Sequence, residues 1–347
     1  MQNSMLTPPR TLPRGCNHVV EVDHRHLIFA WVCFMSCVVA RAADGVPSWL
    51  YPINPPASGA AVNDAVKPLH IAGSSVSFTR AQLNDFYFAP DWYPGLHSPV
   101  PSIVSRGHVP GVFACGYCHS PTGQGRPENA SLAGLSADYI VQQLADFKSG
   151  ARRNPFHGVY LPTDLMIKVS ANAAADEVAA AAQYFAAQTL LPRVKVLERA
   201  RVPLTHVEGW VYVAGAGMSG EPIAGRILEL APDIERHEKR DDHLRYIAYV
   251  PRGSVARGKI LAANGTAAAP IGCVSCHGEN LLGAGLAPPI AGRSPTYILR
   301  QLLALQTGAR AGAGAALMKT LVASLSLEDM VAAAAYAASL PTNAGTL

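Results

Sequence analysis

Two short clusters of cysteine and histidine hold the residue types in this 347-residue chain that are best suited to chemistry. The first cluster reads CGYCH over 115–119, and the second reads CVSCH over 273–277. Each cluster places two thiols three residues apart, with an imidazole directly after the second thiol. One such cluster has several explanations, but two copies suggest a shared cause.

Three chemistries fit paired thiols at this spacing. A thioredoxin-like dithiol needs a Cys-x-x-Cys pair in a βαβ context, whereas the sequence around both clusters reads as helical. A zinc site could take all four thiols, but its two pairs would lie 155 residues apart and the histidines would have no role. Covalent haem accounts for every residue, because Cys-x-x-Cys-His is the attachment motif of c-type haem.

The haem interpretation assigns a role to each side chain. On a helix, positions i and i+3 share a face, so both thiols of a cluster can reach the same porphyrin edge. The expected attachment residues are Cys115, Cys118, Cys273 and Cys276. His119 and His277 are then the proximal iron ligands, and the second ring nitrogen of each should donate to a backbone carbonyl. We expect that carbonyl at Pro288 in the second copy and at Ala130 in the first.

The segments that follow the two histidines repeat each other. A tyrosine lies twenty residues, and a glycine thirty-one residues, after each histidine. Both segments have apolar residues at helical spacing and end at that glycine, Gly150 or Gly308, which is suited to a helix C-cap. The first copy carries six extra residues around NPFHGVYLPTD. We therefore expect a duplicated and mostly helical unit over 105–192 and 253–343.

Two methionines share one register in the repeats and are the candidates for the sixth iron ligand. Met166 lies eighteen residues before Tyr184, and Met318 lies eighteen residues before Tyr336. A lone methionine on a helix is usually core filler, but the shared register favours ligation, whereas Met330 has no counterpart in the other copy. Histidine–methionine ligation raises the reduction potential and leaves no open position on the iron.

The first 42 residues have the layout of a secretory signal peptide. A basic lead precedes an apolar run over 27–40 and small residues around Ala42. These fourteen apolar residues are fewer than the roughly 20 that a spanning helix needs, so we expect cleavage, a periplasmic protein and no membrane span in the mature chain. Cleavage would leave only the four clustered cysteines and change the net charge to +4 − 4 + 2 = +2. This small charge argues against nucleic acid as a partner.

Two segments lie outside the repeats. Residues 43–104 form an N-terminal extension rich in proline and aromatic residues, which is either a docking segment or a strap over the protein's own core. Its one clear helical stretch is 78–88, with Thr79 as the N-cap. Residues 193–252 form a linker, in which VKVLERARV, WVYVAG and YIAYV read as short strands. The charged stretch 233–245 within this linker reads as a solvated loop.

Both copies resemble class I cytochromes c, and the pair resembles a tandem dihaem cytochrome of the periplasmic cytochrome c-four type. The resemblance rests on CGYCH, LAGLSADYIVQQL and GAR in the first copy, and on CVSCH, PPIAGRSPTYILRQL and GAR in the second. It covers about 180 of the 347 residues and lacks a proline at Ala130. It implies a mainly α fold, in which two cytochrome c-type helical domains are joined by a short β-containing linker.

The same resemblance implies two covalently bound haem c groups and electron transfer rather than catalysis. The implied partners are redox proteins: a dehydrogenase or a quinol-oxidising complex as the donor, and an oxidase or another terminal acceptor. The chain could equally be the cytochrome subunit of a dehydrogenase. The alternative is a dihaem peroxidase, in which His157 of the insertion would replace Met166. Arg152 and Arg310 follow the capping glycines, where they could pair with haem propionates or complement a helix C-terminus.

Overall fold

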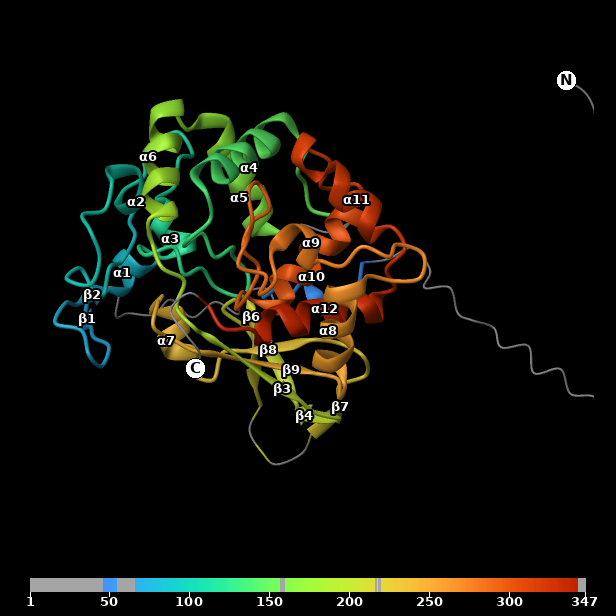
Figure 1. The fold of residues 1–347 in the computed structure, drawn as a ribbon. Helices are drawn as coiled ribbons and strands as arrows, with labels where there is room; N and C mark the ends of the chain where they lie inside the picture. Colours follow the sequence, from blue (N-terminus) through green and yellow to red (C-terminus); the bar gives the residue numbers. More distant parts are fainter. Residues whose placement is uncertain (1–45, 55–65, 157–159, 216, 218–219, 343–347) are drawn as a thin grey trace, which may run out of the picture. The chain divides into compact units, whose positions relative to one another are not determined.

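The structure is a computed structural model that describes residues 46–54, 66–156, 160–215, 217 and 220–342 (Figure 1). The contacts divide the chain into the units 1–43 and 44–347, and all of the described residues lie in the second unit. The predicted signal peptide over 1–42 lies outside the described residues, as do His157 and Met218.

The two repeats form matching sets of helices, drawn in green and in orange to red in Figure 1. The first copy contains α3 (Cys115–His119), α4 (Ala137–Ser149), α5 (Leu161–Asn172) and α6 (Ala175–Ala186), preceded by the single turn α2 (Ser102–Ser105). The second copy contains α8 (Ser254–Asn264), α9 (Val274–His277), α10 (Pro295–Gln306), α11 (Ala316–Val322) and α12 (Leu327–Ser339). In sequence order, α3 to α6 correspond to α9 to α12.

The helix that follows each cysteine cluster starts and stops in the same way. Ser136 caps α4 and Ser294 caps α10, each by accepting the N–H of the residue three positions on. Gly150 ends α4 with φ 76°, and Gly308 follows the last turn of α10 with φ 77°. Both glycines therefore occupy the left-handed region, as the sequence predicts.

The second copy is held together by a close crossing of its first and last helices. At Gly258 of α8, an added Cβ would lie 2.0 Å from the carbonyl oxygen of Ala332 on α12. The buried residues of α12 are mostly small, among them Ala334 and Ala335. Only glycine permits this approach.

The segment between the copies contains more structure than the expected short strands. Five strands form one sheet in the order β3 (Val194–Glu198), β9 (Tyr246–Val250), β8 (Leu228–Leu230), β6 (Val211–Ala214), β5 (Thr205–Glu208). The pairs β3–β9 and β6–β8 are parallel, while β8–β9 and β5–β6 are antiparallel. A second small sheet pairs β4 (Arg201–Pro203) with β7 (Gly220–Pro222). Each of the three predicted strand runs contains a strand, and this β segment lies between the two helical repeats in the sequence.

The prediction of a solvated loop over 233–245 was wrong. This stretch contains α7 (Ile234–Glu238), and the side chains of His237, Asp241 and Asp242 are buried. The buried Asp241 is paired, since its carboxylate lies 2.5 Å from the guanidinium of Arg236. The sequence shows a run of charges but not the distant partners that bury it.

The N-terminal extension contributes to the core in its described parts. Leu50 and Tyr51 near η1 (Ser48–Leu50) are buried, and the Tyr51 ring stacks on Phe156 and meets Tyr160 edge-on. Arg300 of α10 donates to the Leu50 carbonyl oxygen over 3.2 Å. This part of the extension is therefore a strap over the protein's own core.

The helix predicted over 78–88 is shorter than expected. The small hairpin β1 (Pro68–Leu69) and β2 (Phe78–Thr79) leads into α1 (Arg80–Leu83), which Thr79 caps as predicted, together with Gln82 in a capping box. The chain then leaves the helix because Phe86 packs on Tyr117, whereas Phe88 packs back on Phe78.

No single helix among the described residues is both long and apolar enough to cross a membrane, although the bent pair Ala313–Val322 and Leu327–Ser339 meets the criteria of length and composition together.

Candidate functional site

The two histidines of the cysteine clusters are held identically. The Nδ1 atom of His119 lies 2.8 Å from the carbonyl oxygen of Ala130, and that of His277 lies 2.8 Å from the carbonyl oxygen of Pro288. A carbonyl only accepts, so each Nδ1 carries the proton and each Nε2 keeps a free lone pair. Burial lowers the pKa of both imidazoles, and Arg152 lowers that of His119 further. Both predicted carbonyl partners are confirmed, and the neutral tautomer suits an iron ligand.

Three of the four clustered thiols have the opposite character to reactive or zinc-binding cysteines. All four are free, and burial raises the pKa of Cys115 to about 12 and also raises the pKa values of Cys118 and Cys273. A reactive dithiol or a zinc site instead favours the thiolate. Within the described ranges, no group of three or more His, Cys, Asp or Glu side chains gathers to hold a metal, so the two thiol pairs stay separate.

The backbone turns back on itself directly after each histidine. Ser120 has φ 66° and ψ 152°, and its counterpart Gly278 has φ 81° and ψ 161°. The carbonyl oxygens of His119 and His277 then accept the N–H groups of Gly125 and Gly283, each over 2.8 Å. The donor set and the turn that presents it are therefore the same in both copies, and they fit covalently attached haem.

The two candidate methionines lie on equivalent helices. Met166 is half-buried on α5, next to Leu165, which lines a cavity shared with Cys118. Met318 is half-buried on α11 and packs beside Leu305 of α10. Met330 is 1% exposed inside the core of the second copy, as expected of core filler. The ligand role of Met166 and Met318 stays a prediction.

The two arginines that follow the capping glycines reach across from one copy to the other. Arg152 of the first copy donates to the Tyr297 hydroxyl and to Gln301 Oε1 of the second, each over 2.9 Å. Arg310 of the second copy donates to the Tyr139 hydroxyl of the first over 2.6 Å and to Gln143 Oε1 over 2.9 Å. Both guanidinium groups therefore bind tyrosine and glutamine from the opposite copy.

The backbone around these arginines is paired in the same reciprocal way. The N–H of Arg153 donates to the carbonyl oxygen of Ala309, and the N–H of Ala311 donates to that of Ala151, each over 2.7 Å. The identical GAR triplets thus form a short antiparallel contact between the repeats. The sequence repeat singled out the two arginines, but it could not show that each one forms hydrogen bonds with the other copy.

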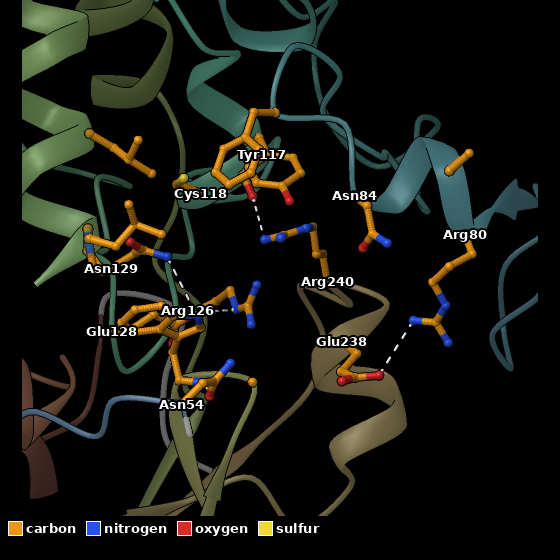
Figure 2. A pocket seen from close by; sticks show the side chains of 17 residues that line it. Asn54, Arg80, Asn84, Tyr117, Cys118, Arg126, Glu128, Asn129, Glu238 and Arg240 are labelled. Atoms are coloured by element: carbon orange, nitrogen blue, oxygen red, sulfur yellow. Dashed lines mark hydrogen bonds and ion pairs between the residues drawn. The ribbon is translucent and has the colours of Figure 1, made fainter. Parts of the chain in front are cut away.

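A cavity of about 580 Å³ lies beside Cys118 (Figure 2). The first copy contributes Tyr117, Cys118, Arg126, Glu128 and residues of α5 to its lining, while the other segments contribute Arg80, Asn84, Trp210, Glu238 and Arg240. The volume falls in the range of small-molecule and cofactor sites. Its polar residues were missed at the sequence level, since most of them lie in the extension and in the supposed loop.

One turn in the repeats carries different chemistry in the two copies. The bridge between Arg126 and Asn129 has its equivalent in the bridge between Ala284 and Ala287. The first turn holds a buried ion pair, with Arg126 Nε 2.8 Å from Glu128, whereas the second exposes Leu286 at 90%. Comparison of the residues seven and nine positions after each histidine could have found this difference from the sequence.

Comparison with known proteins places the chain in a family. No family model matches it. Cytochrome c-554(548) of Halomonas halodenitrificans is 43% identical over 67 residues, which are 18% of this chain and 78% of that protein. The chain is a c-type cytochrome. Like the tandem class I cytochromes that it resembles, this cytochrome has two covalently bound haem c groups.

Two larger proteins show the extent of the likeness. Cytochrome c4 of Azotobacter vinelandii is 30% identical over 138 residues, or 36% of this cytochrome, and the match spans 63% of the relative, less than two thirds of its length. The thiosulfate dehydrogenase electron acceptor of Stutzerimonas stutzeri is 27% identical over 237 residues, which are 67% of this cytochrome and 82% of that protein.

Two solved structures are similar to parts of this cytochrome. Thiosulfate dehydrogenase (TsdBA) from Marichromatium purpuratum superposes with a TM-score of 0.45 and 25% identity, over 67% of this cytochrome and 37% of that chain. Reduced cytochrome c4 from Pseudomonas stutzeri gives a TM-score of 0.42 and 21% identity, over 65% of this cytochrome and 93% of that chain.

Proposed function

We propose that this cytochrome transfers electrons in the periplasm between protein partners and is not itself an enzyme. The proposal rests on two identical histidine–carbonyl sites, one in each repeat. Reciprocal arginine contacts join the two repeats that carry these sites. A single site could serve many chemistries. Two matched sites fixed against each other suit the passage of electrons from one to the other.

We infer that each cysteine cluster attaches one haem. The thioether bonds would form at Cys115, Cys118, Cys273 and Cys276; His119 and His277 would be the proximal ligands, and Met166 and Met318 the distal ligands. Each haem supplies a one-electron iron couple when bound. The carbonyl oxygens of Ala130 and Pro288 hold the imidazole rings in one tautomer, which would leave Nε2 free to bind the iron.

The proposed organisation is a cytochrome c domain over 105–192 and a second over 253–343. The reciprocal contacts of Arg152 and Arg310 hold the two domains in one orientation. A fixed separation of the haems matters because the rate of electron exchange falls steeply with distance. The buried strap residues Leu50 and Tyr51 support the same rigid arrangement.

The proposed partners are a dehydrogenase or quinol-oxidising complex as the donor and an oxidase or similar complex as the acceptor. The relative named as a thiosulfate dehydrogenase electron acceptor supports a dehydrogenase donor. The exposed apolar residues near the second cluster, Ile271 at 50%, Leu282 at 37% and Leu286 at 90%, support exchange with a protein at the second copy. Leu286→Glu should slow transfer with such a protein, whereas Leu204→Glu in the β segment should leave the rate unchanged.

The deciding experiment uses the secreted protein, produced in a cell that attaches haem. We expect a haem-stained band on a denaturing gel, with two haems per chain by iron content. Met166→Leu and Met318→Leu should each remove half of the sulfur-to-iron absorption band of the oxidised protein, and Met330→Leu should remove none of it. A colourless band would refute the proposal. An intact absorption band in both of the first two variants would refute the distal ligands alone.

A further inference from the structure

Arg293 of the second copy donates hydrogen bonds to both copies. It lies directly before Ser294, the N-cap of α10. Its Nε atom donates to the carbonyl oxygen of Pro289 in its own copy over 2.7 Å. Its Nη1 and Nη2 atoms donate to the carbonyl oxygens of Ser131 and Ala133 in the first copy, over 2.6 and 2.9 Å. One guanidinium group therefore joins a loop of the first copy to a loop of the second.

These two loops are the ones that hold the histidines. In the first copy, Ser131 directly follows Ala130, whose carbonyl oxygen binds the histidine ring. In the second copy, Pro289 directly follows Pro288, which binds the other histidine ring in the same way. Arg293 therefore binds each loop one residue beyond the carbonyl that accepts the histidine N–H.

The N–H groups of the two loops are held within each copy. Those of Leu132 and Ala133 donate to the carbonyl oxygen of Gly123, and those of the equivalent pair, 290–291, donate to the carbonyl oxygen of Leu281. The loops are thus alike in their N–H bonds, which do not connect the copies. Three of their carbonyl oxygens are instead joined through a single guanidinium group.

Arg293 is buried although these three acceptors are neutral. The residue is 5% exposed, and burial lowers its pKa to about 10, so the side chain is still charged at neutral pH. A buried cation is costly unless hydrogen bonds replace those that it made to water. Three backbone carbonyls supply them, and loss of the guanidinium would in turn leave these carbonyls without this donor. The arginine and the two loops therefore stabilise one another.

The first copy carries a different residue at the equivalent position. Arg293 lies sixteen residues after His277, and the residue sixteen after His119 is Leu135. Leu135 is buried in the apolar core of the first copy. The contact is thus one-sided, in contrast to the reciprocal contacts of the two arginines that follow the capping glycines. A single side chain of the second copy serves both histidine sites.

We propose that Arg293 is a positioning residue shared by the two proximal histidines: it fixes both loops and thereby the bond from each ring Nδ1–H to its carbonyl. The inference rests on the proposed function, in which these histidines are iron ligands. A hydrogen bond from the second ring nitrogen orients a ligating imidazole and raises its basicity. One residue of the second copy therefore tunes both haem sites together.

Hydrogen exchange of the two ring Nδ1–H groups tests this role. NMR of the reduced, haem-loaded full-length protein with isotope-labelled histidine would follow both protons after transfer to heavy water. Arg293→Lys keeps the charge but lacks the planar fork of donors. We expect it to speed the exchange at both His119 and His277 by about tenfold to a hundredfold, the loss of one or two charged hydrogen bonds. Both reduction potentials should rise, because a weaker ring N–H bond makes the imidazole a poorer donor to ferric iron.

Arg300→Lys is the matched control. Arg300 is 4% exposed and also donates to two backbone carbonyls, those of Leu50 and Pro127, which lie outside both loops. Its replacement should change neither the ring exchange nor the potentials. If Arg293→Lys does not fold, Arg293→Gln takes its place with the same expected result, because the amide has only two N–H donors for the three carbonyls.

Unchanged ring exchange at either histidine in the Arg293 variant would overturn the shared role, as would unchanged potentials or an equal change in Arg300→Lys. An equal increase at the backbone N–H of Ala334, in the buried part of α12, would show a general loss of stability and would also overturn it. All of these outcomes leave the haems in place. A chain that binds no haem would instead refute the proposed function.

Discussion

Replacement of Gly258 by alanine tests the helix crossing on which the second copy depends. Gly258 lies in the interior of α8, where intrinsic helix propensity alone would make alanine more stable by about 1 kcal/mol. The structure predicts the opposite sign. The new Cβ would lie 2.0 Å from the Ala332 carbonyl oxygen and 2.6 Å from Cβ of Tyr336, whereas real Cβ atoms essentially never approach closer than 3.0 Å.

The geometry gives the size of the effect. The helices must separate by at least 3.0 − 2.0 = 1.0 Å at this point, because the blocking atom is backbone and cannot rotate away. A gap of that size forfeits roughly a quarter to a half of the dispersion energy across the contact, and overpacking of a core typically costs about 1–3 kcal/mol. With about 3 kcal/mol for the separation and about 1 kcal/mol regained from propensity, we expect a net loss of ~2 kcal/mol.

Urea unfolding of the haem-loaded protein, followed by circular dichroism, measures this loss. Gly314→Ala is the matched control, because no atom lies within 4 Å of the added Cβ and φ is not positive there. The control should leave the free energy of unfolding unchanged or raise it by up to about 1 kcal/mol, because alanine reduces the conformational freedom of the unfolded chain. If Gly258→Ala proved as stable as the wild type or more stable, α8 and α12 would not cross at this distance, and the reasoning would fail.

Three further predictions follow from other parts of the molecule. Ser120→Gly should raise the free energy of unfolding by about 1 kcal/mol, because Ser120 holds the glycine-like backbone conformation that Gly278 holds in the other copy; an unchanged urea midpoint would contradict this. Burial raises the pKa of Glu229, so the folded state binds more protons than the unfolded state and stability falls as pH rises from about 4.5 through the folded pKa. Glu229→Gln should remove the part of this fall in stability that Glu229 causes. The urea midpoints of the variant and of the wild type, measured across this pH range, should therefore diverge as pH rises. A double-mutant cycle of Arg152→Gln with Tyr297→Phe should give a coupling energy of about 1–3 kcal/mol, and additive effects would show that the contact contributes nothing.

The parts of the site that sequence reasoning found are those that short spacings determine. The Cys-x-x-Cys-His clusters fix the donor set within one helical turn, and the capping glycines and the carbonyl partners of the histidines follow from offsets within one repeat. The carbonyl partners lie only eleven residues from each histidine, which kept both predictions within reach.

The parts that it missed depend on partners far away in the chain. Arg126 and His237 meet across 111 residues, and Arg240 meets Tyr117 across 123. A run of charges such as 233–245 has the same composition whether water or protein surrounds it. Local composition alone therefore favoured a solvated loop over the partly buried segment that the structure has. The predicted helix over 78–88 failed for a related reason, since Phe86 is drawn out of it by packing on Tyr117.

The exchanged arginines give the contact between the repeats the symmetry of a dimer interface. Each repeat presents the same patch to the other and receives the same patch in return, which is the isologous arrangement of a two-fold homodimer. Two separate identical subunits could not differ away from such a contact, whereas two halves of one chain can. The buried ion pair of Arg126 with Glu128 in one half and the exposed Leu286 in the other are differences of this kind.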